Sequence, residues 1–171
     1  MDTFSFTALG THWAISVDGE QLNEKTKEDI LGLLSTFETR FSRFLPDSEV
    51  NAFRTASAGQ YPISVEFAQL LARADQLRLW TGGAFDPAVG SVLARAGYDA
   101  KLSLKEHEEM THPIAGWTLK DSVLTIDGPV AFDLGGIGKG YAIDLVATFL
   151  LERGISHLLV EGGGDMYGTK K

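Results

Sequence analysis

The sequence predicts a mixed α/β (α+β) fold in which helices pack on a partly antiparallel sheet. Apolar residues recur at helical spacing in residues 21–43 and again in Val65–Trp80, which predicts two long amphipathic helices. Short apolar or alternating runs bounded by Gly, Asp and Pro predict the strands. The chain has 171 residues, of which 44% are hydrophobic and 22% are charged, so it is long and apolar enough to build a core. We therefore expect a single domain over residues 1–171.

Composition and charge argue against several classes of function. The formal net charge of −8 disfavours nucleic acid as a partner, because a phosphate backbone needs a basic face. The absence of cysteine excludes disulfides and thiolate metal sites. We expect no signal peptide, no lipidated cysteine and no membrane span, because the sequence lacks a basic n-region and any long apolar run. The histidines lack the spacing of metal ligands; they are His12, His107, His112 and His157.

The first half of the chain contains clear signals for where helices begin and end. Pro46 stops the first long helix, and Asp47 is placed to cap a short helix that follows. Ser64 is placed to cap the second long helix, which Gly82 and Gly83 end. The predicted elements are a strand at 14–17, helices at 21–43, 48–53 and 65–80, and a loop at 56–62.

The second half combines short helices, several strands and one long helix. Ser103 and Glu106 form a capping box for a short charged helix, and Asp127 with Gly128 turns the chain between two strands. The predicted elements are helical turns at 89–95 and 103–110, strands at 117–119, 123–126, 130–134 and 157–161, and a helix from 141 to 153. A second glycine turn with one acid follows at 162–165.

Asp86 is a candidate ligand-binding acid. The proline that follows it, Pro87, disfavours helical geometry at Asp86 and pushes it towards an extended conformation. An acid held in this way hydrogen-bonds a ligand at little ordering cost. The alternative is an Asx-Pro turn with a solvated carboxylate. Among the aromatic residues of the first long helix and its end, Phe44 is the one placed to line a pocket, since it lies beside the break at Pro46.

The most distinctive stretch lies at residues 131–144, where Asp133 is followed by four glycines around a single base, Lys139. The pattern predicts a strand, a glycine-rich turn and a helix, and the unpaired N–H groups of a helix start favour an anion. Lys139 would then be the countercharge for a phosphate, and Asp133 an acceptor for hydroxyl or ring N–H groups. The stretch has neither Walker A nor Rossmann glycine spacing. The alternative is a tight connection whose glycines serve packing alone.

Several segments, taken in order, resemble the motifs of one family. They are LGTHW at 9–13, FSRFLPDSE at 41–49, GGAFDPAVG at 82–90, DLGGIGKGYAID at 133–144 and EGGGD at 161–165. This combination is similar to the ApbE family of FAD:protein FMN transferases, and the resemblance runs from about residue 6 to 168. Leu9 stands where the family usually has Met, and Gly138 where it often has Ala. Family members continue into a second half with a metal-binding Asp/Thr cluster, so we expect this chain to correspond to the N-terminal half.

The resemblance implies a Mg²⁺-dependent transfer of FMN from FAD to a threonine of an acceptor flavoprotein, with release of AMP. It also implies a periplasmic or membrane-anchored location. One Mg²⁺ ligand, a backbone carbonyl, carries over to Gly136. The FAD contacts carry over to Leu9, Phe44, Ala84, Phe85, Asp86, Asp133 and Lys139. The alternatives are a non-catalytic FAD-binding half-domain and a fragment without any ligand.

Overall fold

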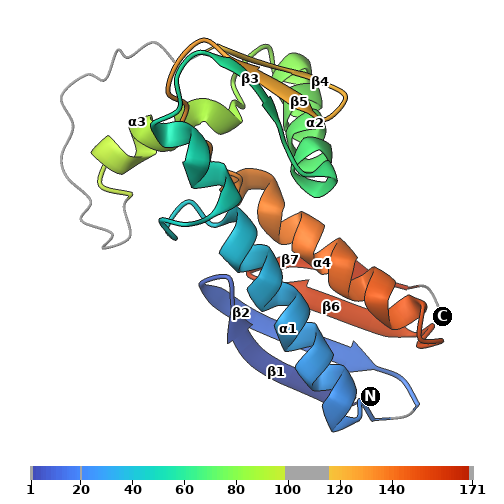
Figure 1. Ribbon diagram of the computed structural model, residues 1–171. Coiled ribbons are helices and arrows are strands. Elements are labelled where there is room, and N and C mark those ends of the chain that lie inside the picture. The colour runs from blue at the N-terminus through green and yellow to red at the C-terminus, as the bar shows by residue number, and fades with distance from the viewer. Residues whose placement is uncertain (1, 20, 99–115, 170–171) are drawn as a thin grey trace. The chain divides into compact units, whose positions relative to one another are not determined.

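The computed structural model describes residues 2–19, 21–98 and 116–169 (Figure 1). The chain divides into two compact units, one formed by Met1–Thr39 with Ile137–Lys171 and the other by Arg40–Gly136. The boundaries fall near one end of helix α1 (Glu24–Phe41) and of helix α4 (Gly135–Leu151), so nearly all of both helices belongs to the first unit. Each unit has its own sheet, and every strand pair in both sheets is antiparallel.

The first unit is a four-stranded sheet in the order β1-β2-β6-β7 with α1 and α4 on one face (Figure 1). Alternation in β2 buries Trp13, Ile15 and Val17, which gives the sheet an apolar face for the helices. The rings of Phe37 on α1 and Tyr141 on α4 stack with centroids 5.8 Å apart. The strands are β1 (Asp2–Ala8), β2 (Thr11–Val17), β6 (Leu158–Gly162) and β7 (Asp165–Gly168).

The second unit has a three-stranded sheet in the order β3-β5-β4 and an aromatic core. Phe132 is at the centre of this core, in edge-to-face contact with Phe53, Phe67 and Trp117 at centroid distances of 6.0, 5.9 and 5.7 Å. The strands are β3 (Gly59–Pro62), β4 (Trp117–Lys120) and β5 (Val123–Ile126). The helices are η1 (Glu49–Arg54), α2 (Val65–Trp80), η2 (Pro87–Val89) and α3 (Gly90–Arg95).

The predicted strand at 130–134 is wrong. This segment has no regular secondary structure and lies outside both sheets, because its backbone bonds go to short helices. Val130 N donates to Phe53 O at 2.9 Å, and Asp133 N donates to Pro87 O at 2.7 Å. Gly90 N donates to the carbonyl of Ala131 at 2.9 Å. The segment therefore fixes the Asp86–Pro87 turn against Asp133.

Other boundaries also differ from the prediction. The first long helix begins three residues later than expected, where Asn23 Oδ1 accepts from Thr26 N at 2.8 Å, and it ends at Phe41, before Pro46. The short helix at Glu49–Arg54 has Ser48 as its N-cap rather than Asp47. The expected loop at 56–62 contains β3, and strands β1 and β7 were not predicted. The expected helix at 103–110 lies outside the described residues. Among the described helices, none is long and apolar enough to cross a membrane.

Candidate functional site

The glycine-rich stretch is the start of α4 itself, not a turn before it. Gly135, Gly136, Gly138 and Gly140 all lie within the helix, and none of them has a positive φ. The need for glycine here is close approach rather than unusual backbone geometry. A Cβ at Gly136 would lie 2.9 Å from Cε2 of Phe85, inside the contact distance of real side chains. The prediction of a strand followed by a glycine turn is therefore corrected to a helix whose first turn packs against Phe85.

Asp133 lies two residues before the first residue of this helix. Its Oδ1 accepts a hydrogen bond from Gly135 N at 2.6 Å, which satisfies one of the unpaired donors of the helix start. A Cβ at Gly135 would lie 2.8 Å from the same oxygen, so glycine is required for the carboxylate to reach that donor. Asp133 therefore lies beside the N-terminus of α4, whereas the sequence predicted a glycine turn between Asp133 and a helix that starts at 141.

Asp86 adopts the extended conformation that Pro87 predicts, with φ −144° and ψ 123°. Its Oδ1 accepts from Ala88 N at 2.8 Å and lies 3.5 Å from Nε1 of Trp117. The Asx turn, considered above as the alternative to ligand binding, is therefore present. It holds the carboxylate in one orientation, and the backbone bond from Asp133 N to Pro87 O ties the two acidic segments together.

Arg43 was missed by the sequence analysis. Its Nε donates to Oδ2 of Asp133, and the two side chains are only 9% and 11% exposed. Its Nη2 donates to the carbonyl of Tyr98. The guanidinium carbon lies 4.3 Å from the ring centroid of Phe44 and 5.0 Å from that of Tyr98. No spacing rule could have found this pair, because the partners are 90 positions apart in sequence.

The remaining predicted residues, Leu9 and Lys139, belong to the first unit. Leu9 has a positive φ of 51° in the turn between β1 and β2. Gly163 N, in the turn between β6 and β7, donates to His12 O at 3.1 Å, so these two turns lie at the same end of the sheet. A Cβ at Gly163 would lie 3.3 Å from Cδ of Lys139. The stem of Lys139 therefore lies against the glycine turn at that end.

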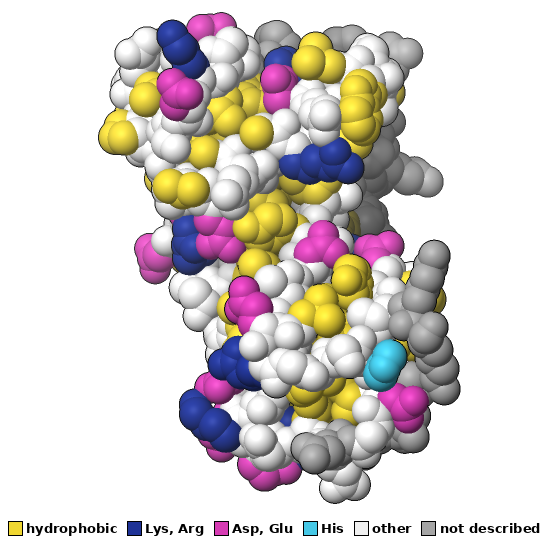
Figure 2. Space-filling model, turned by 90° about the vertical axis from the view of Figure 1, so that its right-hand side faces the viewer, with side chains coloured by type: hydrophobic (Ala, Val, Ile, Leu, Met, Phe, Trp, Pro, Cys, Tyr) yellow, Lys and Arg dark blue, Asp and Glu magenta, His cyan; other side chains and the backbone are white. Residues whose placement is uncertain are grey.

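The predicted residues thus form two groups, each within its own unit. Leu9 and Lys139 lie at one end of the first sheet. The second unit contains Phe44, Ala84, Phe85, Asp86, Asp133 and Gly136. Acidic and basic side chains are mixed with hydrophobic ones on the face shown in Figure 2. Across residues 2–19, 21–98 and 116–169, no group of three or more His, Asp and Glu side chains could hold a metal ion.

Comparison with known proteins identifies one family. The model of the ApbE family matches residues 9–171. An FAD:protein FMN transferase of Haemophilus influenzae is 29% identical over 87% of this chain and 47% of its own length. The Escherichia coli (strain K12) protein of the same name is 26% identical over 92% of this chain and 50% of its own. The chain therefore spans about half the length of these curated relatives.

Two solved structures have the same fold. The ApbE protein of Thermotoga maritima superposes with a TM-score of 0.82 at 26% identity, over 96% of this chain and 57% of its own. The flavin transferase ApbE of Vibrio cholerae superposes with a TM-score of 0.83 at 24% identity, over 98% of this chain and 59% of its own. The mixed fold with antiparallel sheets is therefore confirmed.

Proposed function

Because the chain belongs to the ApbE family, we propose that it is the FAD-binding part of an FAD:protein FMN transferase. The observation that carries the proposal is the arrangement around the start of α4. There the Asp86 turn, the Phe85 ring and Asp133 meet the first glycines of the helix within one unit. Fixed carboxylates beside an aromatic ring suit a ligand with hydroxyl groups, ring N–H groups and a planar ring system.

The residues have distinct roles in this proposal. Asp86 and Asp133 each already accept one backbone N–H, so their orientation is set before a ligand arrives. Lys139 supplies positive charge for the pyrophosphate of FAD, which matters in a chain whose net charge is −8. Leu9 and Phe44 add apolar contact area. In the transfer step, the acceptor hydroxyl oxygen forms a bond to the FMN phosphorus, the bond from that phosphorus to AMP breaks, and the hydroxyl proton is lost.

The magnesium ion belongs to the proposal on resemblance alone. Mg²⁺ needs near-octahedral oxygen coordination, usually with carboxylates as well as phosphate oxygens. The described residues provide no such cluster, and the carbonyl of Gly136 by itself is not a complete site. The described part of the chain does not fit a full magnesium centre, so we assign its residues to binding and orienting FAD. This favours, as a second candidate, a binding half that does not transfer FMN on its own.

Intact-mass spectrometry distinguishes these two candidates. An acceptor flavoprotein with a target threonine is incubated with this chain, FAD and Mg²⁺, and its mass is compared with a sample lacking the chain. We expect FAD binding without a Mg²⁺-dependent FMN adduct. A clean adduct would instead show that this chain completes the metal site and is a transferase by itself.

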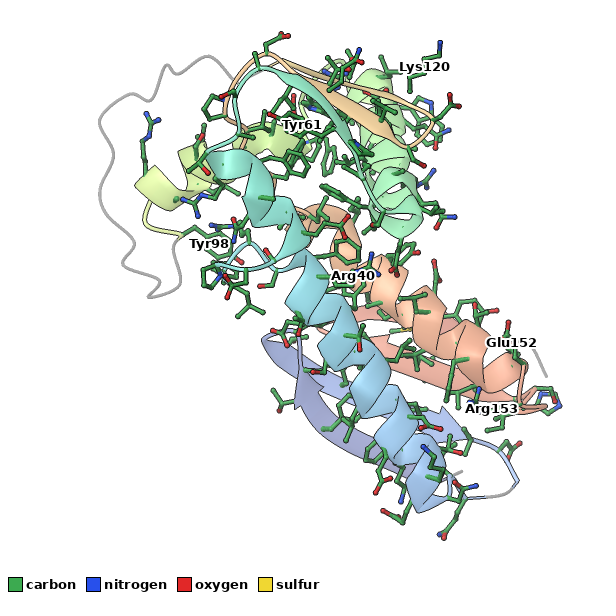
Figure 3. The ribbon with its side chains drawn as sticks, viewed as in Figure 1. Arg40, Tyr61, Tyr98, Lys120, Glu152 and Arg153 are labelled. Atoms are coloured by element: carbon green, nitrogen blue, oxygen red, sulfur yellow. The ribbon has the colours of Figure 1, made fainter. Side chains whose placement is uncertain are left out.

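Lys139→Ala tests the binding role within the same proposal. The loss of a charge-assisted contact of about 1.5–3 kcal/mol should weaken FAD binding roughly tenfold or more. Lys120→Ala is the matched control, since Lys120 is an exposed lysine at the end of β4 (Figure 3). Equal affinities of the two variants would remove Lys139 from the site.

A further inference from the structure

Arg43 lies beside two aromatic rings in the second unit. Its guanidinium carbon is within 5.0 Å of the centroids of both Phe44 and Tyr98. The two rings meet edge to face, with centroids 6.0 Å apart and planes at 79°. Figure 3 shows Tyr98 beside the loop that follows α1. The three side chains thus form one continuous cluster, which we call the Arg43 cluster.

In the Arg43 cluster the charged side chain is more buried than the two aromatic residues, the reverse of the usual pattern. The charged member, Arg43, is 9% exposed, whereas Phe44 and Tyr98 are 42% and 45% exposed. A buried charge is costly unless it is paired and hydrogen-bonded, and here Asp133 and the carbonyl of Tyr98 provide those partners. The ion pair is therefore covered, while the two aromatic residues that it touches remain partly exposed.

Tyr98 is held in place from both sides. Its N–H donates to Leu93 O at 2.9 Å across the end of α3, and its carbonyl accepts from Arg43. The chain enters this position through Gly97, whose φ of 77° is in the left-handed region that favours glycine. These bonds fix the backbone of Tyr98, and a half-exposed aromatic ring on a fixed backbone beside a guanidinium is suited to stack on a planar ligand ring.

We propose that the Arg43 cluster is a stacking platform for a planar ring of the flavin nucleotide. Tyr98 is an additional ligand-contact residue, and Arg43 is a positioning residue that orients both ring side chains and Asp133. This inference rests on the proposed function, and goes beyond it by giving roles to Arg43 and Tyr98, which are not among the FAD contacts that the resemblance implies. The ring it stacks on is either the isoalloxazine or the adenine, which share the same planar aromatic chemistry.

Tyr98→Leu and Tyr98→Phe test the contact role. Their dissociation constants are measured for FAD, riboflavin and AMP by calorimetry. Stacking on one aromatic ring corresponds to roughly a tenfold change in affinity. We expect Tyr98→Leu to lose about that factor for FAD and for whichever of riboflavin and AMP carries the stacked ring, while Tyr98→Phe binds like the parent. Tyr61→Leu is the matched control, because Tyr61 is a half-buried tyrosine of the same unit that packs on Phe53 (Figure 3).

Arg43→Lys and Arg43→Ala test the positioning role. Lysine keeps the charge but lacks the planar fork that pairs with a carboxylate and lies flat on rings. We expect both variants to bind about tenfold more weakly to whichever of riboflavin and AMP carries the stacked ring. Added guanidinium ion should restore part of the affinity of Arg43→Ala. Arg40→Lys is the control, since Arg40 stacks on Phe41 and pairs with Glu49 and Glu66, none of which belongs to the cluster. Thermal melts of all variants separate loss of binding from loss of folding.

The outcomes separate this inference from the proposed function. If the parent binds FAD and Tyr98→Leu binds it equally well, the proposed function stands and the stacking platform is wrong. If the parent does not bind FAD but binds riboflavin or AMP, and Tyr98→Leu weakens that binding, the platform stands and the proposed function is wrong. A parent that binds none of the three compounds overturns both. Guanidinium that rescues no affinity in a folded Arg43→Ala protein overturns the positioning role.

Discussion

The contact between Gly136 and Phe85 makes a prediction that can be tested against a neighbour in the same helix. Replacing a glycine by alanine in a helix interior normally stabilises the protein by about 0.5–1 kcal/mol. At Gly140 a new Cβ meets nothing within 4 Å, so Gly140→Ala should show that gain in full. At Gly136 the new Cβ would lie 2.9 Å from Cε2 of Phe85, and forcing in an extra methyl group typically costs about 1–3 kcal/mol.

The two effects oppose each other at Gly136, and we expect the packing cost to equal or exceed the helix gain. Gly136→Ala should therefore be destabilising by roughly 0–2.5 kcal/mol, the difference between that cost and the helix gain. A change of about 1 kcal/mol shifts the melting temperature of a chain of this length by about 2–4 °C. We expect Gly140→Ala to melt above the parent and Gly136→Ala at or below it. Gly136→Ala should also weaken FAD binding, because Phe85 is displaced.

Thermal denaturation followed by circular dichroism, with flavin titration of each variant, measures both effects. If Gly136→Ala raises the melting temperature as much as Gly140→Ala and leaves FAD affinity unchanged, Phe85 does not pack on the start of α4. The explanation of the glycine-rich motif by close approach would then be wrong.

Three further predictions follow from individual contacts. Ser64→Ala should destabilise the protein by about 1 kcal/mol, because Ser64 Oγ caps α2 by accepting from Phe67 N at 3.1 Å; urea denaturation measures it, and an unchanged midpoint would exclude the cap. Asp86→Asn should bind FAD more weakly than the parent, since it removes the charge but keeps an acceptor for Ala88 N. If calorimetry gives the same FAD affinity for Asp86→Asn, Asp86→Ala and the parent, the carboxylate is purely structural. Gly97→Ala should be destabilising by about 1 kcal/mol and should weaken riboflavin binding, because alanine is strained at φ 77°. A melting temperature and a riboflavin affinity equal to the parent's would contradict the anchoring of Tyr98.

Local patterns were sufficient to predict the long helices and several site details. The second helix spans Val65–Trp80 with Ser64 as its cap, as its spacing and N-cap residue predict. The extended geometry of Asp86 followed from the steric demand of Pro87 alone. These features depend on residues that are neighbours in sequence, so a single sequence contains the information that determines them.

Features that depend on distant partners could not be predicted in the same way. The segment at 130–134 has the composition of a strand, yet its hydrogen bonds go to Phe53, Pro87 and Gly90 rather than to a neighbouring strand. β3 is short, contains Pro62 and pairs with a strand more than sixty positions later, so nothing local distinguishes it from a loop. The Arg43–Asp133 pair likewise joins residues 90 positions apart.

The most direct test of the account is a calorimetric titration of the purified chain with FAD. We expect saturable binding that Asp133→Asn weakens, because the proposed function makes the carboxylate that caps α4 and pairs with Arg43 a contact of FAD as well. Asp121→Asn, which alters an exposed acid in the turn between β4 and β5, should bind FAD like the parent. Absence of saturable binding, or equal affinities for Asp133→Asn and Asp121→Asn, would contradict the assignment of this region as the FAD-binding part of a transferase.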